Sequence, residues 1–398
     1  MCGIAGWFDP RARVADGEDR LRRMLALIRH RGPDEFGLYL DPHVGLGNAR
    51  LSIVDLEGGQ QPIANEDESL WIVFNGEIFN HVELRAELER RGHQFRTHTD
   101  TEVILHLFED VGPECLARLN GQWALAIWDR RARSLFLARD RLGVRPLFYV
   151  ERDGALFFGS EIKTLLAGAP VSAEIEPAVL DEIFTFWAPL PPRTVFRGIV
   201  ELPPGHWLTI NERGSQLRRF WQLDFSGPGP ERTGEELLEE FRSLLIDATR
   251  LRLRADVPVG AYLSGGLDSS TIAAIIRRHT SVSLDTFSIA FDDAQFDESR
   301  FQGQMAAALG TRHQVVRATH ADIGEVFPEV IWHTETPLLR TAPAPMFLLS
   351  RRVRDARYKV VLTGEGADEF LAGYDIFKEA RVRRFWARQP QSRWRPLL

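Results

Sequence analysis

The stretch VPVGAYLSGGLDSS, residues 257–270, decides the fold of the second half of this sequence. Val257–Leu263 is a short apolar run typical of a buried strand, and a helical pattern begins at about Ser269. The glycine turn Ser264-Gly265-Gly266 lies between them. A strand that passes through glycines into a helix N-terminus offers backbone N–H groups and a helix dipole to an anion. The stretch therefore predicts a phosphate-binding loop at the end of a strand.

Hydroxyl and acidic side chains complete this loop. The string Ser264-Gly265-Gly266-Leu267-Asp268-Ser269-Ser270 contains no GxxxxGK[ST], so it is not the loop of GTPases and kinases. Ser264, Ser269 and Ser270 add hydroxyl donors, and Asp268 stands close to the expected position of a triphosphate. Because a carboxylate beside phosphates needs a cation between them, the loop implies Mg²⁺ with Asp268 as a ligand.

A second acidic, glycine-rich loop follows another candidate strand. Lys359–Leu362 leads into Thr363-Gly364-Glu365-Gly366-Ala367-Asp368-Glu369. Open parallel sheets bind ligands at the carboxyl ends of their strands. Asp368 is therefore the candidate second ligand of Mg²⁺.

Strands and helices alternate around these two loops. The candidate strands are Val257–Leu263, Thr286–Phe291, His313–Val316 and Lys359–Leu362, and helices are expected over about 269–279, 299–309 and 346–356. This alternation predicts a mostly parallel sheet with crossover helices, which is an α/β nucleotide-binding domain.

The first half of the chain is instead rich in short strands. Apolar runs bounded by turn residues predict strands at Trp71–Phe74, Trp123–Trp128, Ser134–Ala138, Leu147–Val150 and Ala155–Phe158. Helical spacing puts Leu21, Met24, Leu25 and Ile28 on one face, and Val103, Ile104, Leu107, Phe108 and Val111 on another. Strands with helices outside them indicate a layered α+β domain. Proline and glycine then alternate up to Pro230, as in a linker, and Thr233–Glu236 fits a capping box that starts a helix.

Composition excludes several classes of protein. The 398 residues carry a net charge of −7, so no basic excess is available to bind nucleic acid. Two cysteines cannot form a disulfide framework. The N-terminus does not resemble a signal peptide, and no run of about 18 apolar residues predicts a membrane span. We expect a cytoplasmic protein without nucleic-acid or membrane partners.

Cys2 follows the initiator methionine directly. Removal of Met1 would place a thiol and an α-amino group on one carbon. An α-amino group has an ordinary pKa near 7.7–8.0, so it can accept the thiol proton near neutral pH. Cys2 is therefore a candidate nucleophile that carries its own base. Cys115 has no neighbouring motif and is interpreted as a packing residue.

Five motifs in the first 220 or so residues resemble the class II, N-terminal-nucleophile glutamine amidotransferases. They are Cys2-Gly3-Ile4-Ala5-Gly6, Arg31-Gly32-Pro33-Asp34, Arg50-Leu51-Ser52-Ile53-Val54, Phe74-Asn75-Gly76-Glu77-Ile78 with Asn80, and Asp100-Thr101-Glu102. The resemblance implies a four-layer α/β/β/α sandwich of the Ntn hydrolase type. It also implies glutamine hydrolysis through a thioester on Cys2.

The same resemblance assigns the glutamine site. It implies that the Asn75 amide and the Gly76 N–H form an oxyanion hole, and that Arg50 binds the glutamine α-carboxylate. Glu77 and Asp100 would bind the α-ammonium group. The glutamine-binding residues expected are Arg50, Leu51, Ser52, Ile53, Val54, Asn75, Gly76, Glu77 and Asp100.

The string SGGLDSS resembles the pyrophosphate loop of the ATP pyrophosphatases. Together with the first half and the string GEGADE, it makes the whole chain similar to the glutamine-hydrolysing asparagine synthetases. This resemblance implies a glutaminase domain over 2–222, a linker over 223–232 and an ATP-pyrophosphatase domain over 233–398. The substrates implied are glutamine, aspartate and ATP, with Mg²⁺, and the family suggests a homodimer.

Nucleotide contacts and a proton-handling residue follow from this resemblance. The ATP-binding residues expected are Leu263, Ser264, Gly265, Gly266, Asp268, Ser269, Ser270, Ile289, Thr363 and Gly364. Glu365 matches a residue that handles protons during ammonia attack. Leu339–Met346 resembles, more loosely, the aspartate and channel region of the family.

Three alternatives stay open, the third being a non-enzymatic product of truncation that pairs with other subunits. The acceptor could be a carboxylate other than that of aspartate, because the aspartate pocket is weakly marked. The second alternative is a glutaminase-only form, because the family continues beyond Leu398 with further helices, so we expect the synthetase domain to be incomplete. His30, His98 and His106 have no metal-ligand partners at useful spacing and are interpreted as structural or surface residues.

Overall fold

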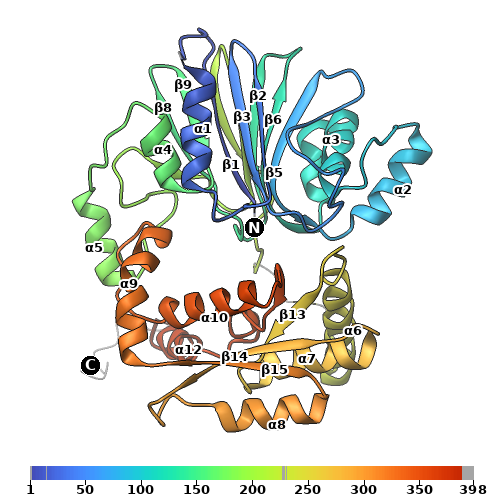
Figure 1. Ribbon diagram of the computed structural model, residues 1–398, viewed down its shortest axis with the longest axis vertical. Helices are drawn as coiled ribbons and strands as arrows, with labels where there is room; N and C mark the ends of the chain where they lie inside the picture. Colours follow the sequence, from blue (N-terminus) through green and yellow to red (C-terminus); the bar gives the residue numbers. More distant parts are fainter. Residues whose placement is uncertain (1, 15, 226–228, 230, 388–398) are drawn as a thin grey trace. The chain divides into compact units, whose positions relative to one another are not determined.

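The computed structural model describes residues 2–14, 16–225, 229 and 231–387 (Figure 1). The chain divides into two compact units. The first comprises Met1–Ser243, Leu251–Val257 and Ala321–Phe347, and the second Leu244–Arg250, Pro258–His320 and Leu348–Leu398. Part of the predicted linker, residues 226–228 and 230, lies outside the described residues.

Two six-stranded antiparallel sheets form the centre of the first unit. One has the order β10-β8-β9-β1-β3-β2 and the other β12-β11-β7-β6-β5-β4. The strands of the first are β1 Gly3–Phe8, β2 Glu35–Leu40, β3 Val44–Arg50, β8 Phe148–Arg152, β9 Ala155–Gly159 and β10 Val200–Glu201. Those of the second are β4 Ile63–Ala64, β5 Leu70–Ile78, β6 Gly121–Asp129, β7 Ser134–Arg139, β11 His206–Asn211 and β12 Gly214–Arg219. All five predicted strands of this half are confirmed.

Helices cover the outer face of each sheet. The helices α1 Gly17–Leu27 and α4 Ile162–Gly168 lie against the first sheet, and α2 His81–Arg91 and α3 Asp100–Val111 against the second (Figure 1). An apolar layer that includes Ile4, Val73 and Trp128 fills the space between the sheets. The unit is therefore the predicted four-layer α/β/β/α sandwich. Its remaining helical elements include η1 Gly112–Arg118, α5 Pro177–Phe186 and, except for its first residue, α9 His320–Thr334.

One predicted helix face is fully buried, and the other is buried at Val103, Ile104 and Leu107 but exposed at Val111, which is 38% exposed. Leu21, Met24, Leu25 and Ile28 are at most 2% exposed and pack on the first sheet. Burial of a side chain of this size stabilises the fold by about 1.5–3 kcal/mol. The spacing that predicted the helix thus also fixes which face meets the sheet.

The second unit is built on a four-stranded parallel sheet of order β15-β14-β13-β16. Its strands are β13 Val259–Tyr262, β14 Asp285–Phe291, β15 Arg312–Ala318 and β16 Val360–Leu362. Its helices include α7 Leu267–His279, α8 Ser299–Leu309, α11 Ala367–Leu371 and α12 Asp375–Ala387, while α6 Gly234–Leu251 and α10 Pro343–Asp355 have residues in both units. The predicted parallel α/β domain is confirmed.

Two local predictions can also be checked. Glu236 accepts the Thr233 backbone N–H at 2.8 Å, and Thr233 Oγ1 accepts the Glu236 N–H at 3.2 Å, which is the predicted capping box. No helix among the described residues is both long and apolar enough to cross a membrane.

Candidate active site

Cys2 lies directly before β1, a central strand of the first sheet. Its side chain is 9% exposed. The Leu51 backbone N–H donates to the Cys2 sulfur at 3.3 Å, and the Leu51 carbonyl oxygen lies 3.7 Å from the same atom. Arg31 Nε donates to the Cys2 carbonyl oxygen at 3.0 Å. The fold thus holds the candidate nucleophile against the segment expected to bind glutamine.

Arg50, at the end of β3, is buried and fully engaged in shaping that segment. Its guanidinium pairs with Glu35 at 2.8 Å and donates to the carbonyl oxygens of Val54 at 3.1 Å and Asp55 at 2.5 Å. The Ser52 N–H donates to Asp34 at 2.9 Å, which fixes the other side of the loop. A glutamine carboxylate that reached Arg50 would have to replace one of these acceptors.

Asn75 is the most unusual polar residue of this region. It lies on β5 with no exposed surface, and neither atom of its side-chain amide has a hydrogen-bond partner among the described residues. An unsatisfied buried polar group costs about 1–3 kcal/mol. The backbone next to it is held rigidly, because Gln61 accepts the Phe74 N–H at 2.7 Å and Asn48 donates to the Phe74 carbonyl at 3.1 Å. The amide is therefore a preorganised donor without an acceptor.

Gly76 needs to be glycine because β6 approaches its backbone. A Cβ atom at this position would lie 2.2 Å from the Gln122 carbonyl oxygen and 2.7 Å from the Trp123 Cα. The backbone that approaches Gly76 therefore belongs to a neighbouring strand of the same sheet.

Two carboxylates lie together beside this strand. Burial, and after it the charge of Asp100, raises the pKa of Glu77 to about 7, although Arg145 and Arg252 oppose the shift. Burial also raises the pKa of Asp100, which accepts the Ile78 N–H at 2.8 Å at the start of α3. Two neighbouring carboxylates in a buried site favour a cationic ligand.

Sequence reasoning missed several residues that build this site. Arg145 is half-buried, and its guanidinium interacts electrostatically with both Glu77 and Cys2, while burial lowers its pKa. Gln61 and Asn48 fix the strand that carries Asn75. None of these residues belongs to a repeating pattern, so only the fold brings them to the site. Cys115 is buried in the core and burial raises its pKa to about 12, which agrees with a packing role.

The predicted phosphate loop joins β13 to α7 in the second unit. The Ser264 N–H donates to Ser269 Oγ at 3.1 Å, and the two hydroxyl oxygens are 2.9 Å apart. Gly265 has a φ of +84°, and a Cβ there would lie 2.8 Å from the Gln302 backbone nitrogen. Asp268 lies in the first turn of α7. The loop therefore has the strand–glycine–helix geometry that binds phosphates.

The second acidic loop packs directly on the first. β16 pairs with β13 in parallel, so both loops leave the same edge of the sheet. A Cβ on Gly364 would lie 2.8 Å from the Ser269 backbone nitrogen and 3.0 Å from the Asp268 Cβ. Asp368 lies in the first turn of α11, and Glu365 is exposed. Two loops that bring hydroxyl and carboxylate side chains together at the end of a parallel sheet suit a nucleotide with a divalent cation.

The remaining expected nucleotide contacts lie at the ends of the central strands. Leu263 is buried, and its carbonyl oxygen accepts a hydrogen bond from Ser288 Oγ. Ile289 lies on β14, where Gln302 donates to its carbonyl oxygen at 2.8 Å. The Leu339–Met346 stretch belongs to the first unit.

Known families match both halves of the chain. The glutamine amidotransferase domain model matches residues 1–221, and the asparagine synthase model matches residues 240–397. Asparagine synthetase [glutamine-hydrolyzing] 1 of Bacillus subtilis is 36% identical over 402 residues, covering 100% of this chain and 63% of the relative. A putative asparagine synthetase [glutamine-hydrolyzing] 2 of Methanocaldococcus jannaschii is 33% identical over 94% of this chain and 76% of the relative.

A relative that is named an amidase has a similar sequence identity to this chain. Amidase chyE of Penicillium rubens is 33% identical over 95% of this chain and 60% of its own length. The chain thus spans 60–76% of the length of these three relatives. With a glutamine amidotransferase domain followed by an asparagine synthase domain, the chain belongs to the family of glutamine-hydrolysing asparagine synthetases.

Proposed function

We propose that this chain is a glutamine-dependent amide ligase that hydrolyses glutamine at Cys2 and transfers the ammonia to an adenylated aspartate. The glutaminase would occupy residues 2–222 and the synthetase 233–398, joined by 223–232. One observation carries the first half: the buried Asn75 amide has no partner among the described residues, as an oxyanion-hole donor requires before substrate binds.

The first reaction uses the groups around Cys2. With Met1 removed, the α-amino group takes the thiol proton, and the sulfur attacks the carboxamide carbon of glutamine. Asn75 and the Gly76 N–H bind the oxyanion that forms. The α-ammonium of Cys2 then protonates the leaving nitrogen, so ammonia departs and a γ-glutamyl thioester remains. Water cleaves the thioester to release glutamate and restore the thiol.

Substrate orientation is assigned to charged groups of the same region. Glu77 and Asp100 supply the negative charge that suits the α-ammonium of glutamine. Arg50 and the Leu51–Val54 backbone bind its α-carboxylate, which takes the place of Glu35 on the guanidinium. These interactions are charge-assisted and therefore roughly twice as strong as neutral hydrogen bonds.

The second reaction is assigned to the two loops of the parallel sheet. The loop Ser264–Ser270 would hold the phosphates of ATP, and Leu263, Ile289, Thr363 and Gly364 would contact the nucleoside. Mg²⁺, held by Asp268 and Asp368, would offset the charge of the triphosphate. The β-carboxylate of aspartate attacks the α-phosphorus and pyrophosphate leaves. Ammonia then attacks the acyl adenylate, with Glu365 accepting a proton, and AMP and asparagine form.

The acceptor carboxylate is the least constrained part of this proposal. The bacterial relative and the archaeal relative are both named asparagine synthetases, which favours aspartate as the acceptor. The similarity to a fungal amidase supports a second candidate, in which the activated carboxylate belongs to another molecule. The chemistry at Cys2 and at the nucleotide loops would be the same in both cases.

Two measurements on the Cys2→Ala variant test the proposal, with Cys115→Ala as the matched cysteine control. Glutamate release from glutamine should vanish in Cys2→Ala and persist in the control. Pyrophosphate release with ATP, ammonia and a carboxylate acceptor should persist in both. A panel of acceptors identifies the carboxylate. Loss of both activities from a folded Cys2→Ala variant would contradict the two-site scheme.

A further inference from the structure

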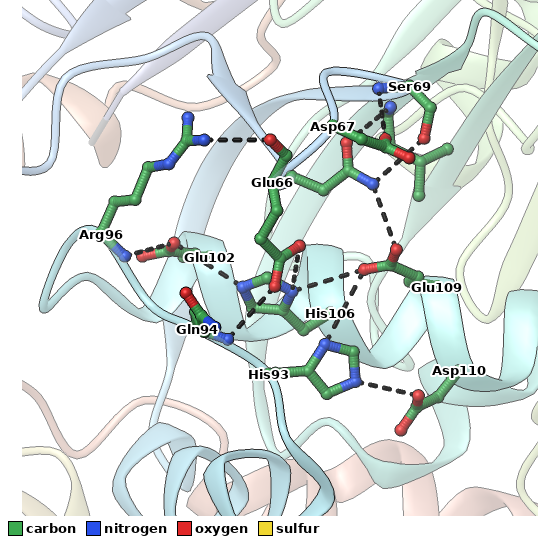
Figure 2. Close-up of polar contacts among 12 residues, drawn as sticks. Glu66, Asp67, Ser69, His93, Gln94, Arg96, Glu102, His106, Glu109 and Asp110 are labelled. Atoms are coloured by element: carbon green, nitrogen blue, oxygen red, sulfur yellow. Dashed lines mark hydrogen bonds and ion pairs between the residues drawn. The ribbon is translucent and has the colours of Figure 1, made fainter.

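A second cluster of histidines and carboxylates lies in the first unit, outside the residues assigned to glutamine (Figure 2). Glu66 comes from the turn between β4 and β5, and His93 from the loop between α2 and α3. His106 and Glu109 lie one turn apart on α3. One side-chain atom of each of the four residues lies within 4.8 Å of those of the other three. Three separate segments thus converge on a single point.

Three separations within this cluster are close to those between the ligands of one metal ion. His106 Nδ1 lies 3.6 Å from Glu66 Oε2 and 3.5 Å from Glu109 Oε2, and His93 Nδ1 lies 3.8 Å from Glu109 Oε2. A nitrogen–oxygen hydrogen bond is about 2.7–3.2 Å long. Bonds of about 2.0–2.2 Å to a tetrahedral ion place its ligands about 3.3–3.6 Å apart. These three separations are longer than ordinary hydrogen bonds and at or just above those expected around one ion, and the other pairs of ligand atoms lie within 4.8 Å.

The burial of His106 is an independent sign of a bound ligand. Its side chain has no exposed surface, and neither ring nitrogen has a hydrogen-bond partner among the described residues. Glu102 Oε1, 3.6 Å from His106 Nε2, instead accepts the Arg96 N–H at 2.8 Å. Buried polar groups are normally satisfied, so a buried nitrogen that lies 3.5–3.6 Å from two carboxylate oxygens without a hydrogen bond to either points to a bound ion.

Surrounding groups orient the ligand atoms. Asp110 Oδ1 accepts a hydrogen bond from His93 Nε2 at 2.9 Å, which leaves the Nδ1 lone pair directed at the cluster. Such a carboxylate–histidine pair is the usual outer shell of a metal site. Glu66 Oε1 accepts the Gln94 N–H at 3.2 Å, and Glu109 Oε1 accepts from Asn65 Nδ2 at 3.3 Å. In both carboxylates the other oxygen faces His106 (Figure 2).

We propose that Glu66, His93, His106 and Glu109 bind a divalent transition-metal ion, best matched by Zn²⁺. Two imidazoles and two carboxylates suit Zn²⁺, whereas Mg²⁺ and Ca²⁺ prefer oxygen ligands alone. Four protein ligands make a closed, structural site. The ion would fasten the Glu66 turn and the His93 loop to α3, the helix that begins at Asp100. Glu66 and Glu109 are partly exposed, which leaves a path for entry.

Zinc binding by the full chain, stripped with a chelator, tests this site. The background is Cys2→Ala, so that the thiol of the candidate nucleophile cannot bind the ion. Calorimetric titration with ZnCl₂ should show about one equivalent per chain, and Zn²⁺ should raise the unfolding temperature by several degrees. MgCl₂ at the same concentration should give neither effect.

Variants locate the binding. His93→Gln and Glu66→Gln change partly exposed side chains and should fold, yet should bind Zn²⁺ at least tenfold more weakly. His98→Gln alters an exposed histidine outside the cluster, and His333→Gln breaks the other candidate group, His30, Glu161 and His333. Both should bind Zn²⁺ like the parent. Equal affinity in His93→Gln and His98→Gln, or no stoichiometric binding at all, would overturn the site and leave only a charge cluster.

Discussion

Arg31 and Glu161 form an ion pair, with Arg31 Nη1 3.0 Å from Glu161 Oε1. The same guanidinium donates through Nε to the Cys2 carbonyl oxygen at 3.0 Å. The position of the candidate nucleophile therefore depends on a carboxylate that lies 159 residues later in the sequence (161 − 2 = 159). His30 Nε2, 2.8 Å from Glu161, and Lys163 Nζ, 2.5 Å away, hold that carboxylate in place.

Glu161 should make the free energy of unfolding depend on pH in the acidic range. Burial alone would raise its pKa, but the hydrogen bond of His30 and the charges of Arg31 and Lys163 outweigh this and hold the pKa at about 2. Because the folded pKa is below the ordinary value of 4.5, the stabilisation is complete above about pH 5 and is lost as the pH falls toward 2. It amounts to roughly 3 kcal/mol at neutral pH.

Urea unfolding of the parent and of Glu161→Gln, at several values between pH 3 and 7, measures this contribution. The difference in unfolding free energy should be largest at pH 7 and shrink toward pH 3. A difference that stays constant with pH would show that Glu161 acts through packing and not through its charge.

Glu77 should give glutamine binding a pH dependence near neutrality. Its pKa of about 7 means that it is substantially protonated at pH 6 and ionised at pH 8. Only the carboxylate form can pair with the α-ammonium of glutamine. The KM for glutamine should therefore rise as the pH falls below about 7, by up to tenfold per unit for one proton. In Glu77→Gln the KM should be high at every pH, and its dependence on pH near 7 should disappear. If the same pH dependence persisted in Glu77→Gln, it would have to be assigned to another group.

Replacement of Asn75 should slow the chemistry more than it weakens binding. Loss of one oxyanion-hole donor typically lowers kcat by about 10²–10³. Asn75→Ala should show that loss in glutamate release with KM changed little. Asn80→Ala is the matched control, because Asn80 makes structural hydrogen bonds to Arg118 and Asn120. The control should lose stability and keep its kcat. Equal kcat values in Asn75→Ala and the parent would remove Asn75 from the oxyanion hole.

The helices and strands could be predicted well because the spacing of apolar residues marks the buried face of each element. Apolar spacing in α1 and the runs in β5 and β6 decide which side faces the core, and local sequence is enough to read them. The parallel sheet could be predicted for the same reason, because apolar strand runs alternate with helical patterns in the second half of the chain. A layered α+β half and a parallel α/β half therefore needed little information beyond short windows of sequence, whereas the four-layer sandwich was implied by the family resemblance.

The supporting residues of the sites could not be predicted in this way. Gln61 and Asn48 contact the strand of Asn75 from positions 13 and 26 residues away from Phe74. His93 and His106 are 13 residues apart in the sequence (106 − 93 = 13). Their rings meet because the loop that carries His93 lies beside α3, which carries His106. His106 was interpreted as structural or surface from the sequence, because only Glu109 of the other three cluster residues has helical spacing to it, and Glu66 and His93 do not. Contacts of this kind depend on the tertiary fold alone.

The approach of the two nucleotide loops leads to a prediction about Gly364. An added Cβ would meet the Ser269 nitrogen at 2.8 Å and the Asp268 carbonyl carbon at 2.9 Å, and backbone atoms cannot yield as a flexible side chain can. Gly364→Ala should push the loops apart and weaken binding of ATP with Mg²⁺ at least tenfold by calorimetry. Gly303→Ala on α8, where a Cβ meets nothing within 4 Å, should leave this affinity unchanged and stabilise its helix by about 0.5–1 kcal/mol. If both variants bound the nucleotide equally well, the two loops could not form one site.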